Sequence, residues 1–106
     1  MLSLFLISLF FQEPEQTMDV RIVPEERIVT SYCLQGIMAN GEQVHNGAAA
    51  CPRAWNLGEV FWVEEDRYVC EDRLSLQYDQ RIDIWKESCD DAIRFGKQQL
   101  TIWRII

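Results

Sequence analysis

The fold is decided by the stretch Arg81-Ile82-Asp83-Ile84-Trp85, together with residues 88–96 and the closing run Leu100-Thr101-Ile102-Trp103-Arg104-Ile105. β-branched and aromatic residues dominate its two ends, which predicts a strand on each side. Between them, Ser88 can act as a helix N-cap and Gly96 can end the helix. We therefore expect a strand, a short helix over about residues 88–96, and a closing strand.

Asp83 stands alone as an acid inside the first of these strands. A carboxylate lowers strand propensity and is costly to bury without partners. The fold must therefore either expose Asp83 to water or hold it in a site, and this choice bears directly on function.

Other segments also carry strand patterns. They are residues 27–33, residues 47–51, and residues 58–64 and 67–72, which form a hairpin through Glu65-Asp66. Turn signals at Gly36, Asn40-Gly41 and Asn46-Gly47 separate the first two segments. About six short strands and one helix predict an all-β fold. A closed or nearly closed β-barrel hides strand edges best in a chain of 106 residues.

Composition limits the function. A content of 48% hydrophobic residues in 106 residues predicts one domain with a compact core. The net charge of −7 argues against nucleic acid and against an anionic membrane surface as partners, because both require clustered Lys and Arg.

Residues 2–11 form an apolar run, followed by a polar leader up to residue 26, so the domain is expected to cover residues 27–106. The run is too short for a stable membrane span but fits the apolar region of a signal peptide. It lacks a preceding Lys or Arg and a following small-residue cleavage site, so a buried N-terminal strand or helix is the alternative. A signal peptide would make the protein secreted, periplasmic or cell-wall associated.

The chain contains four cysteines, Cys33, Cys51, Cys70 and Cys89, and none of them forms a C-x-x-C pair. This spacing favours two disulfides over a zinc site, and it leaves three connectivities open. No metal and no cofactor are expected. His45 is the only histidine, and its place in a turn predicts a surface residue.

The order of several motifs resembles the three-aspartate (3D) domain, a double-psi β-barrel related to MltA-type lytic transglycosylases, RlpA and expansins. The matching motifs are Thr30-Ser31-Tyr32-Cys33, Ala39-Asn40-Gly41-Glu42, Ala49, Pro52-Arg53, Leu57-Gly58, Val69, Glu71-Asp72, Arg81-Ile82-Asp83-Ile84-Trp85, Ser88, Ala92 and Arg94-Phe95-Gly96. The resemblance implies a six-stranded double-psi β-barrel with the short helix before its last strand.

Two of the three aspartates for which the family is named are present, Asp72 and Asp83. The third is replaced by Cys51, and the Thr-Gly that follows the first is replaced by Arg73-Leu74. Strand alternation would place Cys70 on the face of Asp72, so that a Cys51–Cys70 disulfide would stand where the family has a carboxylate. This pairing would leave Cys33 with Cys89.

The resemblance implies a monomeric domain that acts on peptidoglycan. Asp83 would be the catalytic acid and base, with Asp72 as the second catalytic carboxylate. Tyr32, Arg81 and Trp85 are the candidate substrate-binding residues, the last because its ring would lie beside Asp83. A noncatalytic polysaccharide-binding or wall-loosening module is the alternative. An exported domain that binds a protein partner is a third interpretation.

Overall fold

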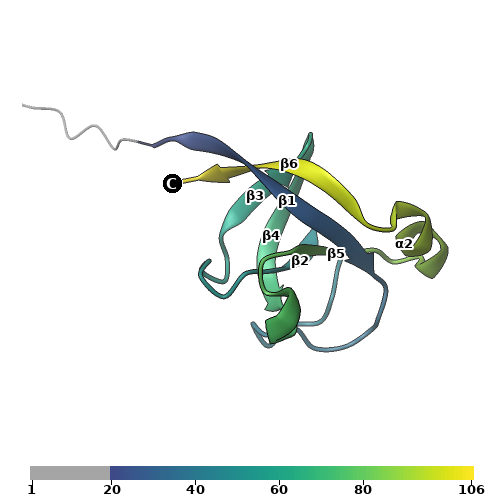
Figure 1. The fold of residues 1–106 in the computed structure, drawn as a ribbon. Helices are drawn as coiled ribbons and strands as arrows, with labels where there is room; N and C mark the ends of the chain where they lie inside the picture. The colour runs from purple at the N-terminus through teal and green to yellow at the C-terminus, as the bar shows by residue number, and fades with distance from the viewer. Residues whose placement is uncertain (1–19) are drawn as a thin grey trace, which may run out of the picture.

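The computed structural model describes residues 20–106 as a closed six-stranded β-barrel with one short α-helix (Figure 1). Its elements are β1 (Ile22–Tyr32), β2 (Ala48–Cys51), β3 (Val60–Val63), β4 (Asp66–Arg73), the 3-10 turn η1 (Leu76–Tyr78), β5 (Ile82–Trp85), α2 (Cys89–Phe95) and β6 (Gln98–Ile105). The signal-like run of residues 2–11 lies outside the described residues. Among residues 20–106, no helix has the length and apolar character needed to cross a membrane.

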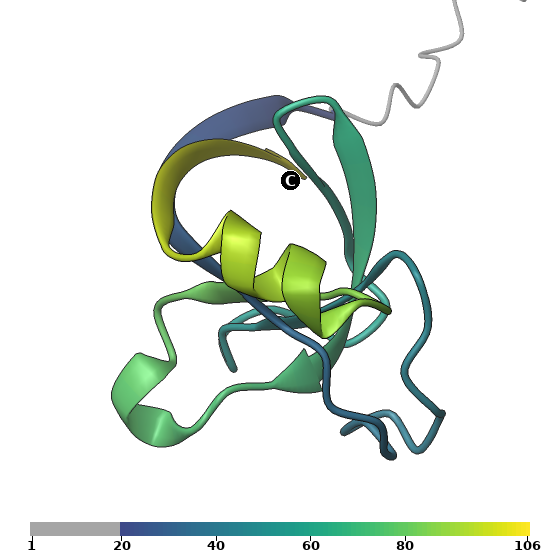
Figure 2. The ribbon, with the colours of Figure 1, turned by 90° about the vertical axis from the view of Figure 1, so that its right-hand side faces the viewer.

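The strands follow one another around the barrel in the order β1-β5-β2-β4-β3-β6. Two neighbouring pairs are parallel, β1 with β5 and β2 with β4, and the other four are antiparallel. Figure 2 shows this ring with α2 lying across one side of it. The predicted six-stranded barrel with a short helix before the last strand is confirmed.

β1 begins at Ile22 rather than at Arg27, and it pairs with β6 from Ile22 opposite Ile105 to Val29 opposite Gln98. Pro24 and the charged residues around it do not follow a strand pattern, so the sequence does not indicate this part of the strand. Pro24 is tolerated because only β6 lies beside β1 at this point, β5 joining from Val29 onward. The first strand therefore includes residues 22–26, which the sequence pattern assigns to the leader.

The core lies inside the ring and is made by alternate residues of the strands. Its buried members are Val29, Ala49, Cys51, Trp55, Phe61, Val63, Cys70, Ile82, Ile84 and Ile102. One end of the interior is filled by charged groups. There the Arg104 guanidinium lies 3.9 Å from the centre of the Trp55 ring and pairs with Glu25 at 3.1 Å and Glu59 at 2.7 Å.

The caps predicted for the helix are present. The Ser88 hydroxyl accepts a hydrogen bond from the Asp91 amide, and Gly96 ends the helix with a φ of 62°, which a residue with a side chain adopts only with strain. Cys89, the first residue of α2, forms a disulfide with Cys33 directly after β1. The helix is therefore fixed covalently to the end of the first strand.

The second disulfide joins Cys51 of β2 to Cys70 of β4, so the predicted connectivity is confirmed. The face predicted for Cys70 is wrong, however. Both sulfurs lie in the core, whereas Asp72 lies on the outer face of the barrel, because the register between β2 and β4 shifts by one residue at Glu71. This β-bulge reverses the alternation between Cys70 and Asp72.

Candidate functional site

The two retained aspartates lie in one row across the outer wall of the barrel. Thr30 of β1 is paired with Asp83 of β5, Asp83 with Ala50 of β2, and Ala50 with Asp72 of β4. Residues paired across a sheet point to the same face, and here that face is the outer one because Ile82 and Ile84 fill the core. With neighbouring strands about 4.8 Å apart, the Cα atoms of the two aspartates lie about 10 Å from each other.

The position of Asp72 in this row depends on the bulge at Glu71. Without the extra residue, Asp72 would point into the core together with Cys70, and Glu71 would point outward. Both acidic side chains reach the loop of residues 33–47, Asp72 at the Ala39 amide and Glu71 at His45. Asp72 joins the row with Asp83, and Glu71 turns toward the loop of residues 33–47.

Asp83 is half-buried and receives a hydrogen bond of 2.9 Å from the Thr30 hydroxyl at Oδ1. Among residues 20–106, no group forms a hydrogen bond with Oδ2 of Asp83. Every fully buried side-chain oxygen in this range has a hydrogen-bond partner. Oδ2 is therefore not fully enclosed by protein atoms. Burial raises the pKa of the Asp83 carboxyl, against the lowering effect of the Thr30 hydrogen bond; the charge of Asp72 raises it further and that of Arg81 lowers it.

Asp72 is held more firmly than Asp83. Its Oδ1 accepts hydrogen bonds from the Ala39 amide at 3.0 Å and the Arg73 amide at 2.9 Å. Its Oδ2 accepts one from the Tyr32 hydroxyl at 3.3 Å. Both oxygens are thus occupied by donors from three segments of the chain, which suits a positioning role better than proton transfer.

Tyr32 reaches across the wall from the end of β1 to Asp72. Burial raises the pKa of its phenol, and the neighbouring charge of Asp72 and the hydrogen bond to it raise it further. The hydroxyl therefore stays protonated at neutral pH and acts as a donor. A cavity of about 210 Å³ lies beside this pair, lined by Tyr32, Asp72, residues 34–37 and Val44.

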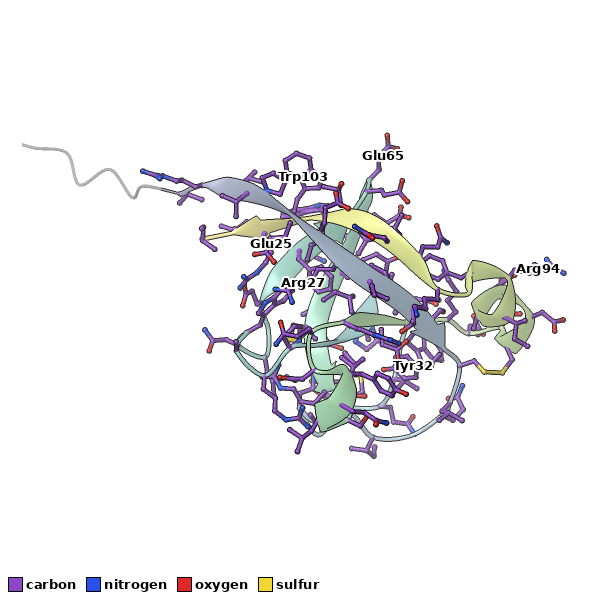
Figure 3. The ribbon with its side chains drawn as sticks, viewed as in Figure 1. Glu25, Arg27, Tyr32, Glu65, Arg94 and Trp103 are labelled. Atoms are coloured by element: carbon purple, nitrogen blue, oxygen red, sulfur yellow. A yellow bond between two sulfur atoms is a disulfide. The ribbon has the colours of Figure 1, made fainter. Side chains whose placement is uncertain are left out.

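The other two predicted binding residues are placed differently. Trp85 is buried and donates its indole N–H to the Leu34 carbonyl at 2.9 Å, so its ring supports the loop. Arg81 lies directly before β5, the strand of Asp83, and its guanidinium sits 4.5 Å from the centre of the Tyr78 ring. Trp103 is 38% exposed on β6, outside the wall that carries Asp83 (Figure 3).

The two departures from the family motif have structural explanations. Cys51 points into the core, where it bonds to Cys70. Arg73 donates to the Pro52 carbonyl at 2.8 Å and to the Trp55 carbonyl at 2.7 Å, which ties the end of β4 to the turn after β2. These residues stabilise the barrel and place no group in the aspartate row.

The raised pKa of Asp83 predicts a pH-dependent stability. A carboxyl whose pKa is higher in the folded state than in the unfolded state favours folding below its unfolded pKa, and this contribution is lost as the pH rises through the folded value. Asp83→Asn keeps an acceptor for Thr30 but removes the charge. We expect the variant to be more stable than the wild type at pH 7 and to lose this advantage toward pH 4, as measured by urea unfolding. A variant less stable than the wild type at pH 7 would contradict the expectation.

Some features of the site have little or no signal in the sequence. Thr30 belongs to a recognised motif, but its partnership with Asp83 depends on the parallel pairing of β1 and β5. The loop of residues 33–47 covers Trp85 and donates to Asp72, which turn residues alone do not predict. A cavity of about 600 Å³ lies elsewhere, bordered by Trp85, Lys86 and the start of β4, and its lining includes neither Asp72 nor Asp83.

Three comparisons, with protein-family models, with curated proteins and with solved structures, give no match for this chain. The relation to the 3D domain therefore rests on the sequence motifs and stays a prediction.

Proposed function

We propose that this chain is an exported, monomeric cell-wall domain of the 3D type that cleaves the glycan strand of peptidoglycan in the manner of a lytic transglycosylase. Asp83 is its acid and base. The two disulfides are compatible with an oxidising compartment outside the cytosol.

The position of Asp83 carries the proposal. Its carboxyl has one oxygen bound by Thr30, and the other has no hydrogen-bond partner among the described residues and is not fully buried. Its pKa is raised, mainly by burial, which favours the protonated form that a general acid requires. Burial would not raise the pKa of an exposed carboxylate in this way.

A single acid and base is sufficient for this reaction. The Oδ2 proton of Asp83 passes to the glycosidic oxygen as the bond from that oxygen to the anomeric carbon breaks. The 6-hydroxyl of the muramic acid attacks the same carbon and gives its proton to Asp83. The products are a free hydroxyl and a 1,6-anhydro sugar, and Asp83 regains its starting state without the addition of water.

The residues around Asp83 have supporting roles in this scheme. Asp72 fixes the Tyr32 hydroxyl and the covering loop, and its charge favours the protonated form of Asp83. Arg81 and Tyr32 border the row and are the candidate contacts for the acidic peptide stems and the sugar hydroxyls.

The test is incubation of the intact protein with purified peptidoglycan, followed by separation of the soluble products by mass. We expect 1,6-anhydro-muropeptides in the soluble fraction. Reducing-end products formed with water would instead indicate ordinary hydrolysis, and the absence of soluble products would overturn the cleavage proposal.

A second candidate function is noncatalytic binding to the wall polysaccharide. It is favoured by the Cys51–Cys70 disulfide, which lies in the core where the family motif has an aspartate. In the same incubation, such a module would sediment with the insoluble peptidoglycan and release nothing.

A further inference from the structure

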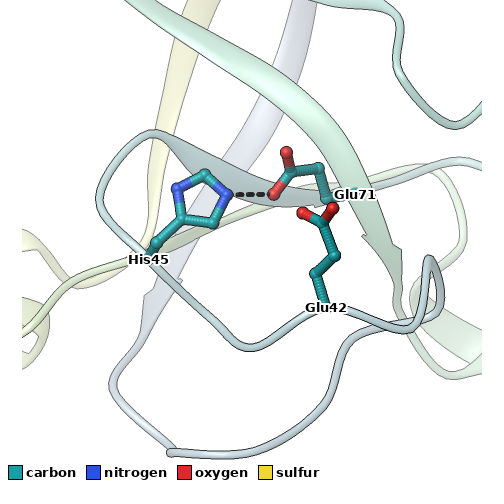
Figure 4. A group of neighbouring side chains, drawn as sticks. All are labelled: Glu42, His45 and Glu71. Atoms are coloured by element: carbon teal, nitrogen blue, oxygen red, sulfur yellow. Dashed lines mark hydrogen bonds and ion pairs between the residues drawn. The ribbon is translucent and has the colours of Figure 1, made fainter.

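A second cluster of ionisable side chains includes Glu71, the bulged residue directly before Asp72. Glu42 and His45 extend from the loop of residues 33–47, and Glu71 extends from β4 (Figure 4). One ligand atom from each of the three lies within 4.8 Å of the others. The cluster thus joins the loop to the barrel wall.

The His45 ring is oriented for ligation through Nε2. Its Nδ1 lies 2.8 Å from the Asn46 carbonyl oxygen, which can only accept, so Nδ1 carries a proton and donates it. Nε2 points toward the Glu71 carboxylate, with 2.5 Å between Nε2 and Oε2. A histidine that binds a metal through one ring nitrogen commonly donates the other N–H to a backbone carbonyl, as Nδ1 does here.

Glu71 is the most constrained member of the cluster. It is the bulged residue of β4, and it is only 9% exposed, the one charged residue among the buried residues of the described chain. Its carbonyl accepts a hydrogen bond from the Asn40 amide, so both its backbone and its side chain contact the loop. Burial of a carboxylate is costly unless a cation or donors compensate it.

We propose that Glu42, His45 and Glu71 form a binding site for a divalent transition-metal ion, with Zn²⁺ as the best match. A tetrahedral zinc ion holds its ligands at about 2.0–2.2 Å and therefore separates them from one another by about 3.4 Å. Nε2 of His45 and Oε2 of Glu71 would move apart from their present 2.5 Å, and the ligand atom of Glu42 lies within 4.8 Å of both residues' ligand atoms. The ion takes the place of the proton between His45 and Glu71, and solvent completes the fourth position.

The donor set determines the class of metal. One imidazole and two carboxylates suit zinc and its neighbours in the transition series, whereas Ca²⁺ and Mg²⁺ prefer sites made of oxygen alone. The four cysteines form the two disulfides, and His45 is the only histidine of the chain, so no other imidazole or thiol competes for the ion.

Zinc at this site would bind the loop to the wall that carries the aspartates. The loop contributes the Ala39 amide to Asp72 and residues 34–37 and Val44 to the cavity beside Tyr32. Glu42 and His45 lie in the same loop, on either side of Val44. The metal site is independent of the proposed cleavage reaction, since none of its ligands belongs to the row of Asp83.

The test is calorimetric titration of the full chain with Zn²⁺ at pH 7, together with NMR of the one histidine ring. We expect one Zn²⁺ per chain, a shifted His45 resonance, and no displacement by millimolar Ca²⁺ or Mg²⁺. His45→Gln and Glu71→Gln should each weaken binding at least about tenfold, and Glu42→Gln should weaken it as well. Glu65→Gln, at the exposed tip of the β3–β4 hairpin, is the matched control and should bind like the wild type (Figure 3).

Two results would overturn the site. One is the absence of Zn²⁺ binding at millimolar concentration. The other is binding that His45→Gln and Glu42→Gln leave unchanged, which would assign the ion to other surface acids. Glu42 is exposed, so its variant tests the site even if Glu71→Gln fails to fold.

Discussion

Replacement of Asp83 by Asn should reduce the release of anhydro-muropeptides at least about 100-fold, the loss typical of removing a general acid and base. The amide oxygen can still accept the Thr30 hydrogen bond, so the geometry of the wall is preserved. What is lost is the transferable proton of the carboxyl group. The measurement is the rate of product release from purified peptidoglycan by wild type and variant at equal concentration.

The control is Asp90→Asn, the same chemical change at an exposed position in the first turn of α2. It should retain wild-type activity. Circular dichroism and urea unfolding of Asp83→Asn separate catalysis from folding: loss of activity with unchanged or increased stability supports the catalytic role. A variant that still releases anhydro products would remove Asp83 from the mechanism.

Removal of the Cys33–Cys89 disulfide should have the largest effect on stability. The bond spans a sequence separation of 56, and closing a loop of this length lowers the entropy of the unfolded chain by an amount equivalent to about 4 kcal/mol. Cys89 is exposed and Cys33 half-buried, so the double variant Cys33→Ser/Cys89→Ser leaves no core cavity. We expect the free energy of unfolding in urea to fall by about this amount.

A comparison with reducing agent tests the same expectation. The Cys33–Cys89 bond lies near the surface, whereas Cys51–Cys70 is enclosed in the core. Mild reduction should therefore lower the stability of the wild type to that of the double variant and leave the double variant itself unchanged. A loss below about 1 kcal/mol would show that strand pairing and the helix caps fix α2 without the disulfide.

The sequence predicts most of the secondary structure because its signals are local. Alternating apolar residues around Asp83 and the Ser88 and Gly96 caps act within a few residues of each other, and both reappear in the structure. The start of β1 is predicted too late, since Pro24 is disfavoured in a strand paired on both sides. It is acceptable here because one side of the strand is free at that point.

The site is less predictable because it depends on register. The bulge at Glu71 has no signal in the sequence, yet it decides that Asp72 joins the outer row and that Cys70 enters the core. It also places Glu71 beside His45. The sequence alone assigns His45 to an isolated surface turn. A shift of one residue changes the face of every side chain beyond it, and only the pairing partner fixes that shift.

The sequence by itself determined the all-β class, the short capped helix, the two candidate acids and their order along the chain. These follow from residue types and spacings that act over a few positions. Only the tertiary structure decided which residues meet: Thr30 with Asp83, Tyr32 with Asp72, and Glu42 and His45 with Glu71. In each group, residues that lie far apart along the chain meet. The strand order of the closed barrel brings them together.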